Sequence, residues 1–365
     1  MSTTDTALDV PVPDVPDVDE LVRAAVRWHF DSATGSPFWV RRAATLGFDP
    51  LTEVDTLADL AMFPNVVDEL RDVPVRDLVP RGYGDVPEIV AVFESGGTTG
   101  SPKRLPLLPD WRDRMLQWTE QDLDRSGIPS GVDYLVVGPT GPHALGWLGG
   151  EVARRRGGLA FHIDFDPRWA KALSAAGDVG EAGRYADHLI AQAADVLRSQ
   201  DIGVLVITPP LLERLVGDDE LVALVNRTVT AFYTAGASMD RDTRHLLRTE
   251  VFPDVLLHGS YGGTMALCPT ASRCGTAGED LVVCDPYSPY VTFSVVDELT
   301  REPVPYGERG QVVINHISRA LFLPNNDERD IATRHPGPPG QAGDSVSDVA
   351  PMPVFGGAAV VEGVY

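Results

Sequence analysis

Six short apolar runs, separated by segments with helical periodicity, occupy the middle of the chain and constrain its fold most strongly. They lie at residues 89–93, 134–137, 159–163, 204–207, 230–234 and 255–258. Just before the fourth run, residues 184–198 place Leu189, Ile190, Ala193, Val196 and Leu197 on one helical face. Asp240 is placed to cap another helix that leads to the last run. A helix feeding a buried strand is the repeating step of an α/β sheet, so we predict an α/β core.

The ends of the chain have a different character. Residues 1–17 alternate Asp, Val and Pro, which predicts a disordered acidic arm, and helical periodicity begins at residue 18. We therefore assign the α/β core to residues 18–260. The runs "LVVCD", "VTFSVVDE" and "QVVINH" predict a β-rich subdomain, a meander or small barrel, over residues 261–335. Residues 336–365 begin with "PGPPGQAGD", which is rich in Pro and Gly, and are predicted to be a linker and short tail.

Charge and composition exclude several functions. The 365 residues carry a net charge of −23, which repels nucleic acid. No apolar run reaches the length of a membrane span, and the N-terminus lacks the features of a secretory signal. Three cysteines do not form a disulfide framework, which favours a cytoplasmic protein. A small anion still requires a local, preorganised site.

A glycine-rich segment, "ESGGTTGSPKRL", follows the first apolar run. Its glycines allow main-chain N–H groups to approach an anion, its hydroxyls add donors, and its lysine adds a charge. The segment has neither the GK[ST] of a Walker A loop nor the GxGxxG of a dinucleotide site. From composition alone it is either a phosphate-binding loop or an ordinary glycine turn.

The order of residues in "SGGTTGSPK" closely resembles the phosphate loop of adenylate-forming enzymes, the superfamily of acyl-CoA synthetases, peptide-synthetase adenylation domains and firefly luciferases. The resemblance implies ATP as cosubstrate and Lys103 as a catalytic residue. It assigns phosphate binding to Ser95, Gly96, Gly97, Thr98, Thr99 and Gly100. It also implies a fold: the large N-terminal domain of such an enzyme, with mixed sheets, packed helices and a β-rich subdomain.

Three downstream segments occur in the order that the superfamily shows. "YTAGASMD" resembles the adenine-pocket segment, and "HGSYGGTM" resembles its Tyr-Gly-x-Thr-Glu motif. "NNDERDIATR" lies where the superfamily has its ribose-binding aspartate, which implies Asp330, with Asp327 as the competing choice. The resemblance places Thr264 near the α-phosphate as a catalytic residue. It assigns adenine and ribose contacts to Gly236, Ala237, Ser238, Ser260, Tyr261 and Gly262.

Two departures from the superfamily concern the metal and the lid. Met265 stands where a glutamate would help to hold Mg²⁺, and a thioether is a poor ligand for that ion, so the metal ligands are unknown. Glu94 or another acid could replace it, phosphates and water could hold the metal, or turnover could be impaired. No lysine follows Lys171, so we expect the C-terminal lid with its catalytic lysine to be absent or vestigial.

The size and motif style resemble the phenylacetate–CoA ligase branch, and within it the compact adenylating enzymes of phenazine antibiotic pathways. "GPTGPHALGWLGG" lies where the acid pocket of the superfamily opens. His143 and Trp147, four residues apart on a helix, would flank a flat aromatic acid, although both could instead be ordinary core and helix-end residues.

The resemblance therefore implies ATP-dependent activation of a small carboxylic acid, aromatic and phenazine-carboxylate-like, to an acyl-adenylate in secondary metabolism. Pyrophosphate is released, and Mg²⁺ is the expected metal. The acyl acceptor would be CoA, a carrier protein or a reductase, and a homodimer is compatible with this role. The alternatives are an aryl-CoA ligase and a nucleotide- or aryl-acid-binding protein that has lost turnover. The cysteines, with His258, would form either a zinc site or, as their spacing favours, a set of buried thiols.

Overall fold

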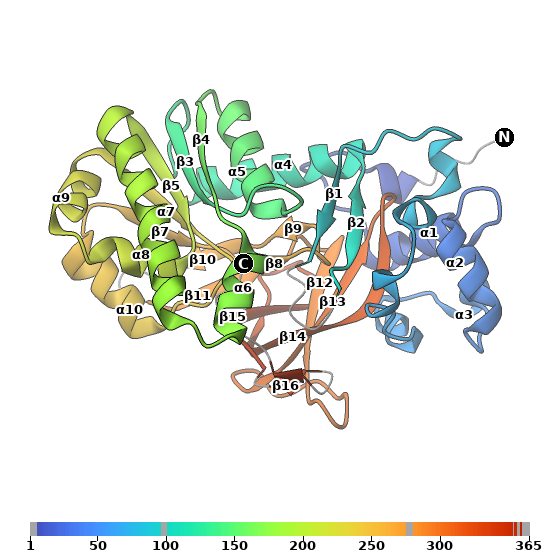
Figure 1. Ribbon diagram of the computed structural model, residues 1–365. Helices are drawn as coiled ribbons and strands as arrows, with labels where there is room; N and C mark the ends of the chain where they lie inside the picture. The colour runs from blue at the N-terminus through green and yellow to red at the C-terminus, as the bar shows by residue number, and fades with distance from the viewer. Residues whose placement is uncertain (1–5, 96–100, 275–279, 353, 356–357, 360–365) are drawn as a thin grey trace.

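A parallel sheet forms one half of the molecule (Figure 1). The computed structural model describes residues 6–95, 101–274, 280–352, 354–355 and 358–359. Within these residues the sheet has five strands in the order β4–β3–β5–β6–β7. The strands are β3 (Asp133–Gly138), β4 (Ala160–Asp164), β5 (Ile202–Ile207), β6 (Ala231–Thr234) and β7 (Leu256–Gly259). All five were predicted as apolar runs, and the predicted α/β fold class is confirmed. The remaining predicted run, at residues 89–93, contributes to strand β1 of a separate two-stranded sheet.

Helices cover both faces of this sheet because its strands are apolar on both sides. One face packs against α4 (Pro109–Arg125) and α5 (Ala144–Arg155). The other packs against α7 (Val179–Ser199), α8 (Pro209–Val216) and α9 (Asp219–Thr228). Two further helices are α6 (Pro167–Ala175) and α10 (Arg241–Leu246), the latter continued by a π-helical turn at Leu247–Val251. Asp240 caps α10, as predicted, by accepting a hydrogen bond from the N–H of Thr243.

The strand order creates a crevice at one edge of the sheet. The chain leaves β3 toward β4 on one side and leaves β5 toward β6 on the other. The loops that follow β3 and β5 therefore diverge at the carboxyl ends of these strands. Ligands of open α/β sheets bind at such a switch point.

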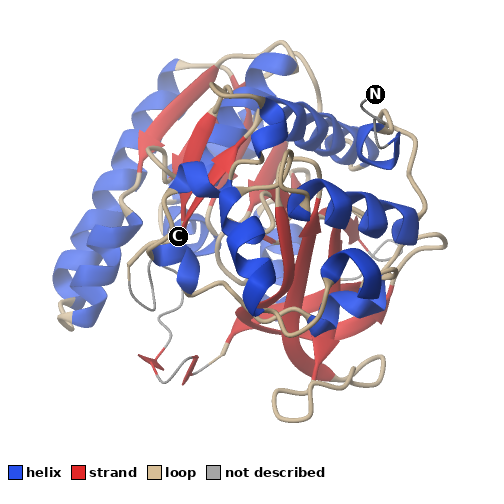
Figure 2. Cartoon of the chain, turned by 90° about the vertical axis from the view of Figure 1, so that its right-hand side faces the viewer, coloured by secondary structure: helices blue, strands red, loops and turns tan. Residues whose placement is uncertain are grey.

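The second half of the molecule is β-rich (Figure 2). Its six-stranded sheet, counted over the described residues, is antiparallel with the order β10–β11–β15–β12–β13–β14, and β14 also pairs with β15. The strands β12, β13, β14 and β15 thereby close into a small barrel. The six strands are β10 (Ala271–Cys274), β11 (Val282–Asp285), β12 (Val291–Val296), β13 (Arg309–Ile317), β14 (Phe322–Pro336) and β15 (Asp344–Pro351).

Two secondary-structure predictions are corrected. Strand β15 lies within residues 336–365, where we predicted a linker. Its sequence did not indicate a strand because its buried positions include Ser345 and Ser347, so it lacks an apolar alternation. The predicted disordered arm contains a 3₁₀ helix at Thr6–Asp9. Ala7 and Leu8 of that helix are buried in the main core, which supplies the apolar contact that a disordered arm would lack.

The N-terminal helices pack on the barrel. They are α1 (Val18–Phe30), α2 (Pro37–Arg42) and α3 (Pro50–Glu53), and several 3₁₀ turns follow them. The predicted apolar stripe of α1 is buried, and the indole of Trp39 on α2 donates a 2.7 Å hydrogen bond to the carbonyl of Phe322 on β14.

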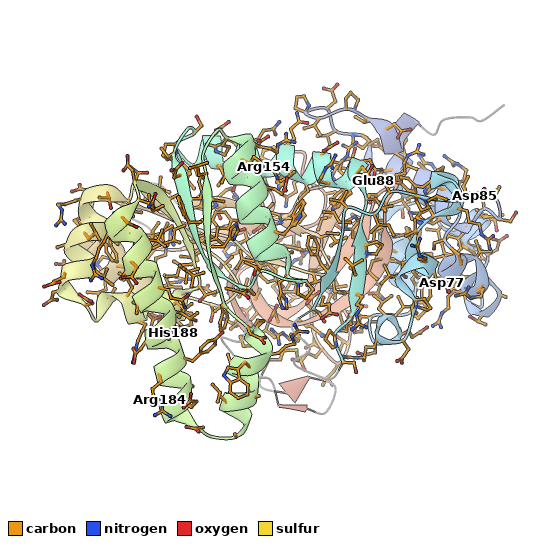
Figure 3. All side chains as sticks on the ribbon, turned by 45° about the horizontal axis from the view of Figure 1, so that its top comes forward. Asp77, Asp85, Glu88, Arg154, Arg184 and His188 are labelled. Atoms are coloured by element: carbon orange, nitrogen blue, oxygen red, sulfur yellow. The ribbon has the colours of Figure 1, made fainter. Side chains whose placement is uncertain are left out.

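Charged side chains remain on the outer surface, as Asp77, Arg154 and Arg184 illustrate (Figure 3). The remaining strands are short: β1 (Ala91–Glu94), β2 (Arg104–Leu107), β8 (Gly262–Gly263), β9 (Cys268–Pro269), β16 (Val354–Phe355) and β17 (Ala358–Ala359). Among the helices of the described residues, none has the length and apolarity needed to cross a bilayer.

Candidate active site

A hairpin carries the glycine-rich segment. Strands β1 and β2 pair antiparallel, with Glu94 opposite Arg104. At the loop end of the pair, the N–H of Ser95 donates to the carbonyl of Lys103 at 2.9 Å, and the N–H of Lys103 donates to Oγ of Ser95 at 3.0 Å. The hairpin therefore brings the two ends of the predicted phosphate loop together. Its other predicted residues, Gly96, Gly97, Thr98, Thr99 and Gly100, lie outside the described residues.

Lys103 extends from this hairpin into a cavity. Its side chain is only 13% exposed, and its Nζ lies 3.9 Å from Oδ1 of Asp68. Burial lowers the pKa of Lys103, and the nearby carboxylate of Glu328 acts in the opposite direction. A half-desolvated ammonium group of this kind interacts more strongly with an entering anion than a surface lysine does.

Two turns at the carboxyl edge of the parallel sheet form the next wall. The turn after β6 contains Gly236, Ala237 and Ser238, and Gly236 adopts a φ of +86°, which a side chain would disfavour. The turn after β7 contains Ser260 and Tyr261 and leads to Thr264, whose hydroxyl donates to the carbonyl of Glu94 at 3.3 Å. Thr264 is thus held beside the end of β1, where the glycine-rich segment begins.

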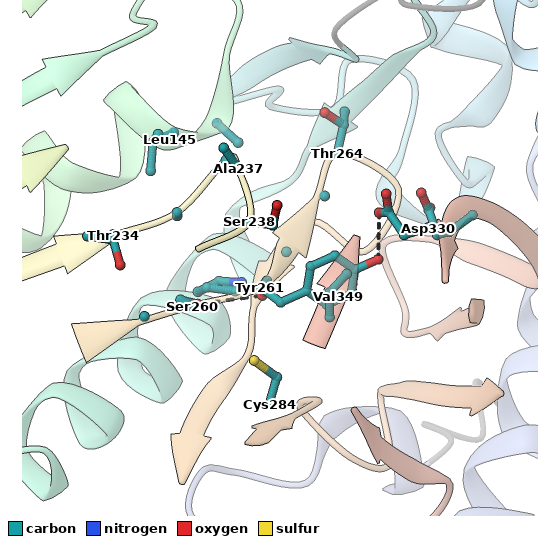
Figure 4. Close-up of a pocket in the computed structure, with 18 of the residues that line it drawn as sticks. Leu145, Thr234, Ala237, Ser238, Ser260, Tyr261, Thr264, Cys284, Asp330 and Val349 are labelled. Carbon is teal, nitrogen blue, oxygen red and sulfur yellow. Dashed lines mark hydrogen bonds between the residues drawn. The ribbon is translucent and has the colours of Figure 1, made fainter. Parts of the chain in front are cut away.

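Tyr261 and Asp330 meet across the cavity (Figure 4). The phenol of Tyr261 donates a 3.0 Å hydrogen bond to Oδ2 of Asp330 on β14. Burial, together with the Asp330 carboxylate, raises the pKa of Tyr261 well above its usual value, so the phenol stays protonated. Asp327, the competing choice for the ribose contact, forms an ion pair with Arg301.

Helix α5 supplies the apolar end of the cavity. His143 immediately precedes this helix and Trp147 lies one turn into it. The indole of Trp147 packs edge-on against Phe93 of β1, with ring centroids 5.6 Å apart. Burial lowers the pKa of His143, and Arg168 acts in the same direction, so the imidazole is neutral at pH 7. Met115 and Leu148 complete an apolar wall next to these rings.

All predicted site residues that the structure describes line one cavity of about 360 Å³. They come from the hairpin, from the start of α5, from the two turns at the sheet edge and from β14. Figure 4 shows residues of the two turns and Asp330 of β14. They are Ser95, Lys103, His143, Trp147, Gly236, Ala237, Ser238, Ser260, Tyr261, Gly262, Thr264 and Asp330.

Solved structures share this architecture. A 2-hydroxyisobutyryl-CoA ligase in complex with 2-HIB-AMP and CoA matches with a TM-score of 0.62 and 17% sequence identity, over 90% of this chain and 65% of that chain. An open conformation of the same ligase, also with 2-HIB-AMP and CoA, matches with a TM-score of 0.62 and 16% identity, over 90% of this chain and 67% of that chain. This chain has the fold of this CoA ligase. The fold class predicted from the sequence is confirmed.

The chain spans about two thirds of the length of the 2-hydroxyisobutyryl-CoA ligase, 65% in one structure and 67% in the other. No family model and no curated protein sequence matches the chain. The likeness therefore concerns the fold, while the chemistry depends on the residues of the cavity.

An apolar residue occupies the position at which the sequence resemblance implies a metal-binding glutamate. Met265 is buried and lines the cavity. Glu94, the substitute considered from the sequence, bonds through one carboxylate oxygen to Arg104 at 2.8 Å and through the other to Arg168 at 3.3 Å. Both oxygens are therefore already engaged by guanidinium groups, which makes Glu94 a poor metal ligand.

Sequence reasoning missed several polar residues of the cavity. Glu328 precedes Asp330 by two positions on β14, so the two share a face of the strand, and this spacing was the available signal. Burial and the adjacent Asp330 raise the pKa of Glu328 to about 7. Arg71 also lines the cavity but belongs to no motif, so nothing in the sequence pointed to it. Arg241 and Asp348 form an ion pair at 2.7 Å that joins α10 to β15 beside the cavity.

The cysteines of known placement are buried thiols. Cys268 and Cys284 are free and line the cavity, and burial raises the pKa of both, that of Cys284 to about 11. His258 does not accompany them as a ligand: its Nε2 lies 3.2 Å from Oδ2 of Asp122, and its ring stacks on Tyr233. In the described part of the chain, no cluster of three or more His, Cys, Asp or Glu residues is arranged to hold a metal ion.

Proposed function

We propose that this protein uses ATP to activate a carboxylic acid as an acyl-adenylate, with release of pyrophosphate. The observation that carries the proposal is the convergence on one cavity of twelve residues, from five separate segments, that the sequence predicted for the site. Their order in the chain and the ligase fold support the same conclusion.

In the proposed reaction a carboxylate oxygen of the acid attacks the α-phosphorus of ATP, and the bond to the pyrophosphate oxygen breaks. The acid is ionised at neutral pH, so no general base is required. The ammonium group of Lys103 stabilises the negative charge that accumulates on the leaving pyrophosphate. Tyr261 packs on the adenine, the turn at 236–238 borders its edge, and Asp330 accepts hydrogen bonds from the ribose. Thr264 exchanges its hydrogen bond to the Glu94 carbonyl for one to an oxygen of the α-phosphate.

The acid is proposed to be aromatic. The apolar end of the cavity presents the flat ring of Trp147, the neutral imidazole of His143 and the side chain of Met115. A flat ring gains more from stacking against such walls than a short aliphatic chain does. A tricyclic acid of the phenazine-carboxylate type, as used in secondary metabolism, fits this description and is the specific substrate class that we propose.

Mg²⁺ binds such nucleotide sites through one or two carboxylates and the phosphates themselves. With Met265 apolar and Glu94 paired, Glu328 is a cavity-lining carboxylate that interacts with Lys103, and Asp330 lies two positions further along β14. We propose that Glu328 holds the ion, with Asp330 beside it. When bound, Mg²⁺ would neutralise charge on the phosphates.

The acyl group would pass from the adenylate to CoA, a carrier protein or a reductase. The 2-hydroxyisobutyryl-CoA ligase of similar fold was crystallised with CoA, which makes CoA the first acceptor to test.

ATP–[³²P]pyrophosphate exchange across a panel of aromatic acids tests the proposal. We expect exchange with at least one aromatic acid and its loss in Lys103→Ala. ATP binding without exchange, for every acid in the panel, would favour the second candidate, a nucleotide-binding protein without turnover. The replacement of the metal-binding glutamate by Met265 is the observation behind that candidate.

A further inference from the structure

Two cationic side chains from distant parts of the sequence lie on the same wall of the cavity. Lys103 belongs to the glycine-rich hairpin, and Arg71 belongs to the short 3₁₀ helix Glu69–Arg71 in the N-terminal region. Their side chains are only 13% and 16% exposed, so both are held against the protein.

Arg71 is oriented by contacts on both sides. Its Nη1 donates to the carbonyl of Ser101, in the segment between Ser95 and Lys103. Its Nε and Nη2 donate to Oδ1 of Asp68 at 3.3 and 3.1 Å. A guanidinium group fixed in this way lies beside Ser101, two residues before Lys103, at the described end of the glycine-rich segment.

Asp68 connects the two cations. The same Oδ1 that accepts from Arg71 lies 3.9 Å from Nζ of Lys103. In contrast to the cations, the Asp68 side chain is 74% exposed. An exposed carboxylate rotates into water at little cost, whereas the two partly desolvated cations remain held in the cavity wall, where they attract an entering anion.

We propose that Arg71 and Lys103 together form the subsite for the pyrophosphate end of the nucleotide, and that Asp68 holds both cations before the nucleotide binds and then gives way to the phosphates. This inference rests on the proposed function. It adds a phosphate-binding residue outside the glycine-rich loop and a carboxylate that competes with the ligand.

The chemistry of the two cations fits a pyrophosphate better than a single carboxylate. The guanidinium fork of Arg71 can donate two parallel hydrogen bonds to one phosphate, and the ammonium group of Lys103 acts as a point charge on the other. Asp68 contacts both cations through a single carboxylate oxygen. A pyrophosphate has several charged oxygens and is therefore the stronger partner for the two cations.

Calorimetric titration of the full chain with inorganic pyrophosphate and with AMP, in the presence of Mg²⁺, tests the inference. We expect Arg71→Ala and Arg71→Gln to weaken pyrophosphate binding about 10-fold and Arg71→Lys to weaken it about 3-fold. AMP lacks the leaving group, so its affinity should stay unchanged, which a general structural defect would not allow. Asp68→Asn should strengthen pyrophosphate binding about 2- to 5-fold.

The matched control is the pair of Arg41 and Asp77, also an arginine–aspartate ion pair of the N-terminal region, at 2.7 Å and away from the cavity. Arg41→Ala and Asp77→Asn should leave pyrophosphate affinity within about 2-fold. Wild-type affinity in a folded Arg71→Gln protein, or weaker binding in Asp68→Asn, would overturn the inference. If Lys103→Ala loses pyrophosphate while Arg71→Gln keeps it, the inference alone fails. If the wild-type protein binds neither pyrophosphate nor ATP, the proposed function fails with it.

Discussion

Tyr261 and Asp330, 69 residues apart in the sequence, are joined by a 3.0 Å hydrogen bond from phenol to carboxylate. The phenol ring also makes an edge-on contact with Phe293, at 5.7 Å between centroids. The turn after β7 and the strand β14 are thus locked together where we propose the nucleoside to bind. This pairing distinguishes Asp330 from Asp327, whose carboxylate is engaged by Arg301.

We expect Asp330→Ala to weaken ATP binding about 10-fold, because two ribose hydroxyls lose a charged acceptor. Tyr261→Phe keeps the ring and should weaken ATP binding less than about 3-fold. Asp327→Asn is the control and should leave ATP affinity unchanged. Titration calorimetry with ATP measures all three, and a larger loss in Asp327→Asn than in Asp330→Ala would reverse the assignment.

Trp147→Ala should raise the KM for an aromatic acid in pyrophosphate exchange about 10-fold or more, because the acid loses a buried aromatic wall. The KM for ATP should change little. Trp169→Ala is the matched control, since the side chain of Trp169 on α6 is 51% exposed. Equal effects of the two substitutions would contradict the assignment of this wall to the acid.

Glu328→Gln should raise the Mg²⁺ concentration needed for half-maximal exchange about 10-fold, because an amide is a weaker ligand than a carboxylate for a hard cation. The variant should still bind AMP normally. Glu302→Gln, at an exposed position, serves as the control. An unchanged Mg²⁺ dependence in Glu328→Gln would show that the ion is held without this residue.

Two buried histidines predict loss of stability in acid. Burial lowers the pKa of His29 to about 4 and that of His316 to about 3. Their side chains accept protons more readily in the unfolded chain, near pH 6.5, so the free energy of unfolding falls as the pH drops below 6.5. We expect a loss of roughly 2 kcal/mol per histidine between pH 7.5 and pH 5.

Urea denaturation at a series of pH values measures this effect. His29→Gln should flatten the pH dependence of the unfolding free energy, whatever it does to stability at pH 8. His188→Gln, at an exposed position on α7, should leave the slope as in the wild-type protein. A wild-type slope in His29→Gln would mean that other groups cause the acid sensitivity.

Cys268 and Cys284 should be unreactive toward Ellman's reagent in the folded protein, because burial raises the pKa of both thiols and little thiolate is present. The experiment is best done with Cys274→Ser protein, in which every remaining thiol is one of these two. Both should react after denaturation in urea. Rapid reaction of either thiol in the native protein would show that the cavity admits the reagent and activates the sulfur.

The helices and strands of the parallel sheet were predictable because their signals are local. Each strand is a short run of apolar residues. The helices carry apolar stripes, and some of them, such as α10 with Asp240, begin at a capping residue. Strand β15 was missed because it buries serines that bond to polar partners, Ser345 with Asp285 among them, so its sequence lacks the usual alternation.

The sequence by itself determined the class of fold and the motifs of the site, since glycine spacing and residue order survive without any knowledge of the distances between them. Only the tertiary structure decided which other residues join that site. Arg71, Glu328 and Asp68 reach the neighbourhood of Lys103 through the packing of the N-terminal region and the barrel against the parallel sheet. Charges brought together by such long-range packing interact strongly because they share a partly desolvated cavity, and no local pattern encodes that proximity.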